Sequence, residues 1–258
     1  MEPTDFFHEN GYVVFKKAIS ESVLDEYNSV WEKENSQKTD QHGNNFGWDK
    51  EEEYLEHPEV MDIMCSPVIT NFFTELKLAV ALHLADTWSM SSEKPWHQDS
   101  RHSNPAAFNN YIGAWVAVEN VSHETGPFQL IPKSHKWSFD KRAVYFGENN
   151  GEVIDGRFFN YELEKLIKEH EEVEHFTFLA QKGDVLIWHG NLLHRALISA
   201  DKNATRKAII GHYSNSKQYE DAVDEGYEKN MISLLDDPNV KQWKNSGYYY
   251  DRRKKSTI

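Results

Sequence analysis

The chain changes from helical to β patterning at LAVALHLADTW, residues 78–88. Large apolar side chains at positions 78, 80, 82, 84 and 88 alternate there with smaller or polar ones, the period of two of a strand whose faces differ. The preceding residues have helical spacing instead, with breaks at Pro58 and Pro67. Residues 78–88 therefore begin a β region that follows a helical one.

Seven further segments have the apolar and β-branched composition of short strands, and turn residues separate several of them. They cover residues 12–17, 112–118, 128–131, 175–179, 185–189, 194–199 and 206–213. The sequence lacks the regular alternation of strand and helix that builds a parallel sheet. This order predicts a mainly β fold with flanking helices, a double-stranded β-helix (jelly roll, cupin-like).

The length favours a single domain over residues 1–258. Within it we expect a helical N-terminal cover (1–77), a jelly-roll core (78–214) and a C-terminal helical or irregular tail (215–258). A hydrophobic share of 39% and an aromatic share of 13% are enough to fill one large core. We expect a monomer or a weak homodimer.

The charge balance limits the partners of this protein. Acidic residues outnumber basic ones by 42 to 28, and the net charge of −14 repels nucleic acids and anionic membranes. No apolar run approaches the ~18 residues of a membrane span. The single cysteine allows no internal disulfide, and the first residues lack the pattern of a secretory signal. We expect a cytoplasmic protein with a small-molecule substrate, no nucleic acid and no membrane.

Thirteen histidines make a metal motif easy to obtain by chance. The place of each candidate motif in the predicted secondary structure therefore has to decide which of them binds a metal. His97-Gln98-Asp99 follows the strand at 78–88. Two other tripeptides of histidine and carboxylates, at 57–59 and 170–172, lie in acidic, helical stretches that a solvated surface explains. Non-haem iron oxygenases bind Fe(II) with two histidines and one carboxylate. The motif at 97–99 therefore requires one more histidine downstream.

The downstream candidates are His189, which ends the predicted strand at 185–189, and His194, which begins the next one; His189 is more simply structural. Twelve residues after His194 comes Arg206, at the start of another predicted strand. If Ala208 and Ile210 face the interior, the period of two turns Arg206 inward as well. A buried guanidinium is costly unless a carboxylate meets it, so an inward Arg206 predicts an acidic ligand.

Motifs spread over residues 5–214 resemble the phytanoyl-CoA dioxygenase (PhyH) family of Fe(II)/2-oxoglutarate oxygenases. Taken together, these motifs are specific. They are FHENGYVV at 7–14, WHQD at 96–99, Trp115, ETGPF at 124–128, IPKSH at 131–135, Gly183-Asp184, the region of His194 and RKAI at 206–209.

The resemblance implies that His97, Asp99 and His194 hold Fe(II). It also implies a reaction that uses O2 and 2-oxoglutarate as co-substrates, hydroxylates an aliphatic C–H group and releases succinate and CO2. Halogenating relatives leave a metal position vacant where the carboxylate would be. The presence of Asp99 therefore favours hydroxylation.

The resemblance further implies how the co-substrate is bound. Arg206 would form a salt bridge to the distal carboxylate of 2-oxoglutarate, and Gln98 and Trp115 would contact the co-substrate. Family members often carry a serine two residues after the distal histidine, where this chain has Ala196. The candidates for a replacement hydroxyl group are Thr205 and Tyr213.

Arg101 and His102, just after the iron motif, and Gln129 are candidate substrate contacts. The acidic balance and the lack of a clustered basic site argue against an acyl-CoA, whose phosphates need basic residues. We expect a small, polar metabolite instead. Two alternatives stay open: a Zn-dependent hydrolase with the same ligands, and a non-catalytic jelly-roll binding protein. Arg206 argues against the hydrolase, which needs no buried clamp for a carboxylate.

Overall fold

The computed structural model describes residues 1–35, 53–99, 111–137, 156–201, 203–215, 227–251 and 253, with the main chain alone at 156–162 and 227–230. Helices dominate the described residues before position 76. They are α1 (Pro3–Asn10), α2 (Glu21–Asn35), the 3-10 turn η1 (Glu53–Leu55), α3 (Pro58–Met64) and α4 (Pro67–Glu75). Both α3 and α4 carry proline in the first turn, where a helix has no use for the backbone N–H. The two prolines therefore divide one helical pattern into two helices.

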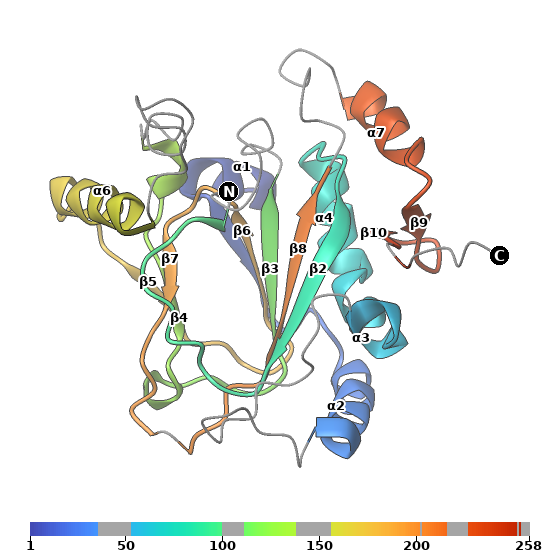
Figure 1. Ribbon diagram of the computed structural model, residues 1–258, viewed down its shortest axis with the longest axis horizontal. Coiled ribbons are helices and arrows are strands. Elements are labelled where there is room, and N and C mark those ends of the chain that lie inside the picture. The colour runs from blue at the N-terminus through green and yellow to red at the C-terminus, as the bar shows by residue number, and fades with distance from the viewer. Residues whose placement is uncertain are drawn as a thin grey trace.

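A seven-stranded major sheet crosses the centre of the molecule (Figure 1). Its order is β1 (Tyr12–Phe15), β6 (Val185–His189), β3 (Ile112–Ala117), β8 (Ala208–Ser214), β2 (Ala81–Trp88), β10 (Tyr248–Tyr250) and β9 (Val240–Gln242). Neighbouring strands are antiparallel except β10 and β2, which are parallel. Most neighbours are far apart in the sequence, as in a jelly roll.

A minor sheet faces the major one. It is antiparallel, in the order β5 (Phe176–Phe178), β4 (Phe128–Leu130) and β7 (His194–Ala196), with the 3-10 turns η4 (His123–Thr125) and η5 (Ser134–Lys136) before and after β4. Helices α2, α3 and α4 cover the other face of the major sheet (Figure 1). Helix α6 (Gly156–Glu169) lies beyond the minor sheet, and α7 (Tyr227–Leu235) lies near β9.

The two faces of the major sheet bury different side chains. Ile209 and Tyr213 of β8 belong to the core that packs against the helices. Ala208 and Ile210 belong to the core between the two sheets, together with Phe128 of β4. The period of two in β8 is therefore as predicted. Arg206 continues the inward series and is 1% exposed.

All eight predicted strands are present within one or a few residues of their expected bounds, and the predicted jelly roll is confirmed. The division into one domain with three parts stays a prediction. Three strands outside the expected core join the major sheet, β1 from residues 1–77 and both β9 and β10 from residues 215–258. Among the described helices, none combines the length and apolar character that crossing a membrane requires.

The carboxylate of Asp184 joins the turn before β6 to the residues after β1. It accepts hydrogen bonds from Lys16 Nζ (2.8 Å) and from the backbone N–H groups of Lys17 (2.8 Å) and Gln181 (2.9 Å). Its side chain is fully buried. Burial alone would raise the pKa of Asp184, but these donors hold it below its usual value of 3.8.

We expect Asp184→Asn to lower the free energy of unfolding by about 2–3 kcal/mol at pH 7, because an amide donor would then face other donors. The folded pKa lies below the unfolded one. The contribution of the carboxylate is therefore fully present above about pH 4 and is lost as the pH falls through the folded pKa. Urea unfolding of wild type and Asp184→Asn at about pH 7 and pH 3 measures the difference between their free energies of unfolding. We expect this difference to be smaller at pH 3 than at pH 7.

Asp201→Asn is a matched control, because the Asp201 carboxylate accepts one backbone N–H, that of Asn203, in an exposed turn. We expect it to change stability by less than about 0.5 kcal/mol. A difference between wild type and Asp184→Asn that stays constant with pH would contradict the role given to the Asp184 carboxylate.

Candidate metal centre

Two distant segments meet at the edge of the minor sheet through a pair of backbone hydrogen bonds. The N–H of His97 donates to the carbonyl of His194 (3.0 Å), and the N–H of His194 donates to the carbonyl of His97 (3.1 Å). The two residues are a directly opposed antiparallel pair, so their side chains leave the same face. Their imidazole centroids are 4.1 Å apart. The main chain alone therefore brings these two histidines together.

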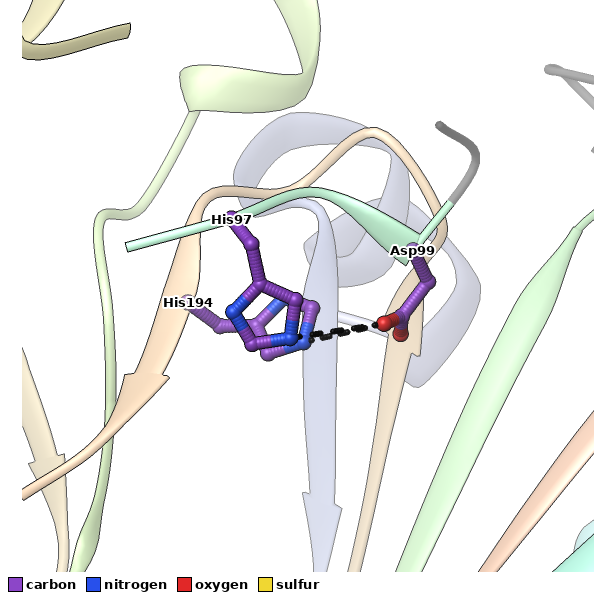
Figure 2. A group of neighbouring side chains, drawn as sticks. All are labelled: His97, Asp99 and His194. Atoms are coloured by element: carbon purple, nitrogen blue, oxygen red, sulfur yellow. Dashed lines mark ion pairs between the residues drawn. The ribbon is translucent and has the colours of Figure 1, made fainter. Parts of the chain in front are cut away.

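Asp99 adds a third donor at the same point (Figure 2). Its Oδ1 lies 3.6 Å from His97 Nε2 and 3.4 Å from His194 Nε2, and one donor atom from each residue lies within 4.8 Å of the others. All three residues are buried, with 7% of His97, 7% of Asp99 and 2% of His194 exposed. The donors therefore converge in a site that largely excludes water.

Hydrogen bonds to backbone carbonyls orient both imidazoles. The Nδ1–H of His97 donates to the carbonyl of Pro95 (2.8 Å), and the Nδ1–H of His194 donates to that of Leu192 (2.9 Å). A carbonyl only accepts, so the proton of each neutral ring lies on Nδ1. Each Nε2 therefore presents its lone pair toward Asp99, as a metal site requires.

The protonation of the site also suits a metal. Burial and the nearby ring of His194 lower the pKa of His97 to about 3, so this imidazole is neutral at pH 7. Burial alone would raise the pKa of Asp99, but the facing histidines, His194 foremost, hold it well below its usual value. Neutral imidazole and ionised carboxylate are the forms that bind metals.

The donor set fits a divalent transition metal. Bonds of about 2.1 Å at right angles place neighbouring donor atoms about 3 Å apart, so the observed 3.4 and 3.6 Å require only small adjustments. Two histidines and one carboxylate with open positions beside them are the ligand set of non-haem Fe(II) oxygenases. Within the described ranges, these three residues are the only such group.

A cavity beside the three donors also reaches Arg206. Arg206 Nη1 donates to the carbonyl of Gly126 (2.7 Å), whereas its Nε has no partner among the residues that the structure describes. Burial lowers the pKa of Arg206 to about 10, so the guanidinium stays charged at neutral pH. A buried cation with an unused donor is suited to an anionic group of a ligand.

A family model described as phytanoyl-CoA dioxygenase (PhyH) matches residues 7–207. The chain belongs to the PhyH family. The family expected from the sequence motifs is therefore confirmed. Membership of this family, together with the cluster of two histidines and one carboxylate, supports a 2-oxoglutarate-dependent oxygenase.

Curated PhyH relatives are distant but extend over most of the chain. Peroxisomal phytanoyl-CoA dioxygenase of Bos taurus is 20% identical over 264 residues, which cover 91% of this chain and 75% of the relative. The Homo sapiens protein of the same name is 22% identical over 244 residues, covering 84% and 68%.

Solved structures resemble the fold. EctD from S. alaskensis with bound Fe aligns with a TM-score of 0.63 at 15% identity, over 82% of this chain and 75% of that chain. The α-ketoglutarate-dependent carbocyclase SnoK from nogalamycin biosynthesis aligns with a TM-score of 0.61 at 18% identity, over 82% of each chain. The epimerase SnoN in complex with Fe3+, α-ketoglutarate and nogalamycin RO has a TM-score of 0.62 at 15% identity, again over 82% of each.

Gln98 and Trp115, which the PhyH resemblance also links to the co-substrate, are not among the residues that line the cavity. Gln98 donates through Nε2 to the carbonyl of Asn191 (2.6 Å), and its Oε1 is buried with no described partner. Trp115 is buried between the sheets, opposite Ile210 of β8, and its Nε1 also lacks a partner in the described part of the chain. Contacts from Gln98 and Trp115 to a co-substrate stay predictions.

Gln129 is not among the residues that line this cavity, and its contact with substrate stays a prediction. Its Nε2 donates to Thr177 Oγ1 (3.0 Å), and its Oε1 accepts from Arg195 Nε (2.8 Å). On β4 it alternates with Phe128 and Leu130, which face the core between the sheets. Gln129 therefore occupies the outer face of the minor sheet. Arg101 and His102 lie outside the described residues.

His189 has a role other than that of a fourth donor. Its Nδ1 accepts the backbone N–H of Asn191 (3.0 Å), and its ring lies 5.4 Å from that of His135.

Neither proposed replacement for the missing serine hydroxyl reaches the cavity. Tyr213 donates to the carbonyl of Met64 (2.6 Å) in the helix-side core, and Thr205 is exposed.

Two neighbours of Asp99 were missed by the sequence reasoning. Trp188 Nε1 donates to Asp99 Oδ2 (2.8 Å), and His212 Nδ1 lies 3.8 Å from the same oxygen. The sequence did carry a signal for His212, because it continues the inward series of Arg206, Ala208 and Ile210 by two residues. Trp188 had no comparable signal, since buried tryptophans are common in cores.

Proposed function

We propose that this chain is an Fe(II)- and 2-oxoglutarate-dependent dioxygenase that hydroxylates an aliphatic C–H group of a small, polar metabolite, consuming O2 and releasing succinate and CO2. One observation carries the proposal. The cluster of His97, Asp99 and His194 shares a cavity with a buried guanidinium, that of Arg206, which forms no ion pair with any described carboxylate. A 2-oxo diacid has a keto-acid end that can bind a metal and a second carboxylate that can pair with the guanidinium.

The residues of the chain have separate tasks in this reaction. His97, Asp99 and His194 would hold Fe(II) through Nε2, Oδ1 and Nε2, and Arg206 would bind the distal carboxylate of 2-oxoglutarate through charge-assisted hydrogen bonds. When bound, iron and the keto acid supply the oxidising chemistry, in which the diacid loses CO2 and O2 is consumed. Holding the two ends of the diacid fixes its position relative to the metal and to the substrate.

The surroundings of the cluster would limit side reactions. The ring of Phe128 stacks on His194 at 5.1 Å with an interplanar angle of 14°, and Trp188 lies 5.3 Å from the same imidazole. These apolar walls exclude water from one side of the donors. A dry site protects both the enzyme and reactive species from competing reactions.

Hydroxylation is the outcome that Asp99 favours, because its carboxylate occupies the metal position that halogenating relatives leave vacant. Proteins of this fold differ in outcome, since the neighbours named above include an epimerase and a carbocyclase. Finding a chlorinated, epimerised or cyclised product in place of a hydroxylated one would contradict this part of the proposal.

A polar substrate is supported by the charges of the chain and of the cavity. The net charge of −14 disfavours the phosphates of an acyl-CoA. Asp86, Lys94 and His212 contribute polar groups to the cavity wall. The acyl-CoA in the names of curated relatives is therefore not proposed for this chain, which is 20–22% identical to them.

The two alternatives, a Zn-dependent hydrolase and a non-catalytic binding protein, both leave Arg206 without a function. A direct experiment separates the three. Protein loaded with Fe(II) under anaerobic conditions is given 2-oxoglutarate and then O2, and succinate is measured with and without a panel of polar metabolites. We expect succinate that depends on Fe(II) and O2, and more of it with the true substrate. If succinate does not exceed that of the Zn(II)-loaded protein, the proposal is wrong.

The alanine at position 196 suggests a gain-of-function variant. Ala196 lines the cavity with Arg206, at the position where family members often carry a serine. We expect Ala196→Ser to lower the Kd for 2-oxoglutarate by about fivefold, because one added hydrogen bond contributes about 1 kcal/mol. Calorimetric titration of the Mn(II)-loaded protein measures it. Ser199→Ala, which removes a hydroxyl that donates to Glu124 and Asp201 carbonyls outside the cavity, is the control and should leave this Kd unchanged.

A further inference from the structure

The two oxygens of Asp99 have different neighbours. Oδ1 faces Nε2 of His97 and His194, at 3.6 and 3.4 Å. Oδ2 points the other way and accepts a hydrogen bond from the indole N–H of Trp188 at 2.8 Å, and both side chains are buried. One oxygen is thus directed toward the metal position, and the other is already engaged.

Trp188 reaches Asp99 from the opposite sheet. It lies on β6 in the major sheet, is 1% exposed, and its ring packs 5.2 Å from Phe128 and 5.3 Å from His194 on the minor-sheet side. The indole therefore contacts two of the three donor residues, one by a hydrogen bond and one by ring packing. Packing on both sides holds the N–H in a fixed direction.

The neighbouring strand β3 leaves space for this indole at Gly113, the cross-strand partner of Trp188. A Cβ at Gly113 would lie 2.2 Å from both Cε2 and Cζ2 of Trp188, closer than any real contact. Gly113 has no positive φ, so backbone strain does not explain the glycine. Glycine is required at position 113 because a Cβ there would overlap the indole ring of Trp188.

We propose that Trp188 is a positioning residue for the metal site: its N–H holds Oδ2 so that Asp99 binds the metal through Oδ1 alone, with Gly113 providing the space for the indole. The inference rests on the metal site of the proposed function. A carboxylate that binds through one oxygen leaves three metal positions for the keto acid and O2, whereas a chelating one closes a position. Partners of this kind orient ligands and typically change metal affinity 10–100-fold.

Trp188→Phe removes the N–H and keeps an aromatic ring. Co(II) serves as the probe and is titrated into the metal-free protein, residues 1–258, at a temperature where every variant is folded. We expect the Kd for Co(II) to rise about 10–100-fold. We also expect the ligand-field spectrum of bound Co(II) to change, because Oδ2 becomes free to approach the metal.

Trp243→Phe is the matched control. Trp243 also donates its indole N–H to an aspartate, Asp62 Oδ1 at 2.8 Å, but this pair joins α3 to the segment between β9 and β10. It should lower stability without changing the affinity or the spectrum of Co(II). An affinity of Trp188→Phe within twofold of wild type, or an equal loss in Trp243→Phe, refutes the inference. Failure of wild type itself to bind Co(II) would instead refute the metal site.

Gly113→Ala tests the space for the ring independently. The added methyl group should displace the indole and weaken Co(II) binding about as much as Trp188→Phe does. In the Trp188→Phe background it should have little further effect on Co(II) affinity, because the N–H that the added methyl group would displace is already absent. If the losses of Co(II) affinity from Gly113→Ala and Trp188→Phe add in full in the double variant, the shared mechanism is contradicted. Residues that act together give non-additive double-mutant cycles.

Discussion

Replacing His194 with alanine is expected to abolish both Fe(II) binding and succinate formation. His194 supplies one of three converging donors, and no other group of three such residues is found in the described part of the chain. Loss of an outer partner of a metal ligand already costs 10–100-fold in affinity, so loss of the ligand should exceed about 100-fold. The backbone pair with His97 uses main-chain atoms alone and should survive the substitution. The variant should therefore fold, and anaerobic Fe(II) titration should detect no tight site.

His189→Asn is the control for His194→Ala. It changes a histidine five residues earlier whose Nδ1 accepts the N–H of Asn191, and an asparagine oxygen can accept the same bond. His189 is not part of the cavity wall. We expect Fe(II) affinity and succinate formation within a few-fold of wild type. Retained Fe(II) binding in His194→Ala together with its loss in His189→Asn would reverse the ligand assignment.

Replacing Arg206 with methionine is expected to raise the Kd for 2-oxoglutarate by roughly 10–150-fold. The affinity for the metal, measured without 2-oxoglutarate, should not change. The estimate follows from the 1.5–3 kcal/mol of a hydrogen bond to a charged group. Arg206→Lys should have an intermediate effect, because lysine keeps the charge and loses the planar fork. In the free protein Arg206 is a buried cation with one carbonyl partner and no described carboxylate, so methionine should not reduce stability.

A second keto acid makes the Arg206 experiment specific. 2-Oxobutyrate retains the metal-binding end of 2-oxoglutarate and lacks the distal carboxylate. Wild type should prefer 2-oxoglutarate by about the factor lost in Arg206→Met, and the variant should bind the two acids almost equally. A variant that still prefers 2-oxoglutarate as strongly as wild type does would show that another cation holds the distal carboxylate.

Local patterns were sufficient to predict most of the fold. The alternation in residues 206–213 identified β8, because one face of this strand packs on helices and the other on the minor sheet. The alternation in residues 78–88 identified β2, although a register shift between Leu82 and Leu84 interrupts it. Asp86 and Trp88, after the shift, line the cavity. β9 and β10 were missed. Each has three residues, and β10 pairs with β2 at a single position, Tyr249 with Leu82. Strands this short carry no detectable period of two.

The same alternation explains which site residues could be predicted. It turned Arg206 inward correctly, and applied consistently it would have placed Gln129 on the outer face and Tyr213 on the helix side. It says nothing about how far a side chain reaches. The hydrogen bond from Trp188 to Asp99 spans the space between two sheets, so its existence depends on tertiary packing that no local pattern contains.

A crystal structure of the full chain with Fe(II) and 2-oxoglutarate, prepared without oxygen and with anomalous data at the iron edge, is the most direct measurement. We expect one iron peak about 2.0–2.3 Å from His97 Nε2, Asp99 Oδ1 and His194 Nε2, with the distal carboxylate of the diacid on the guanidinium of Arg206. Iron bound at other residues, or a diacid whose distal carboxylate lies away from Arg206, would contradict the proposed function.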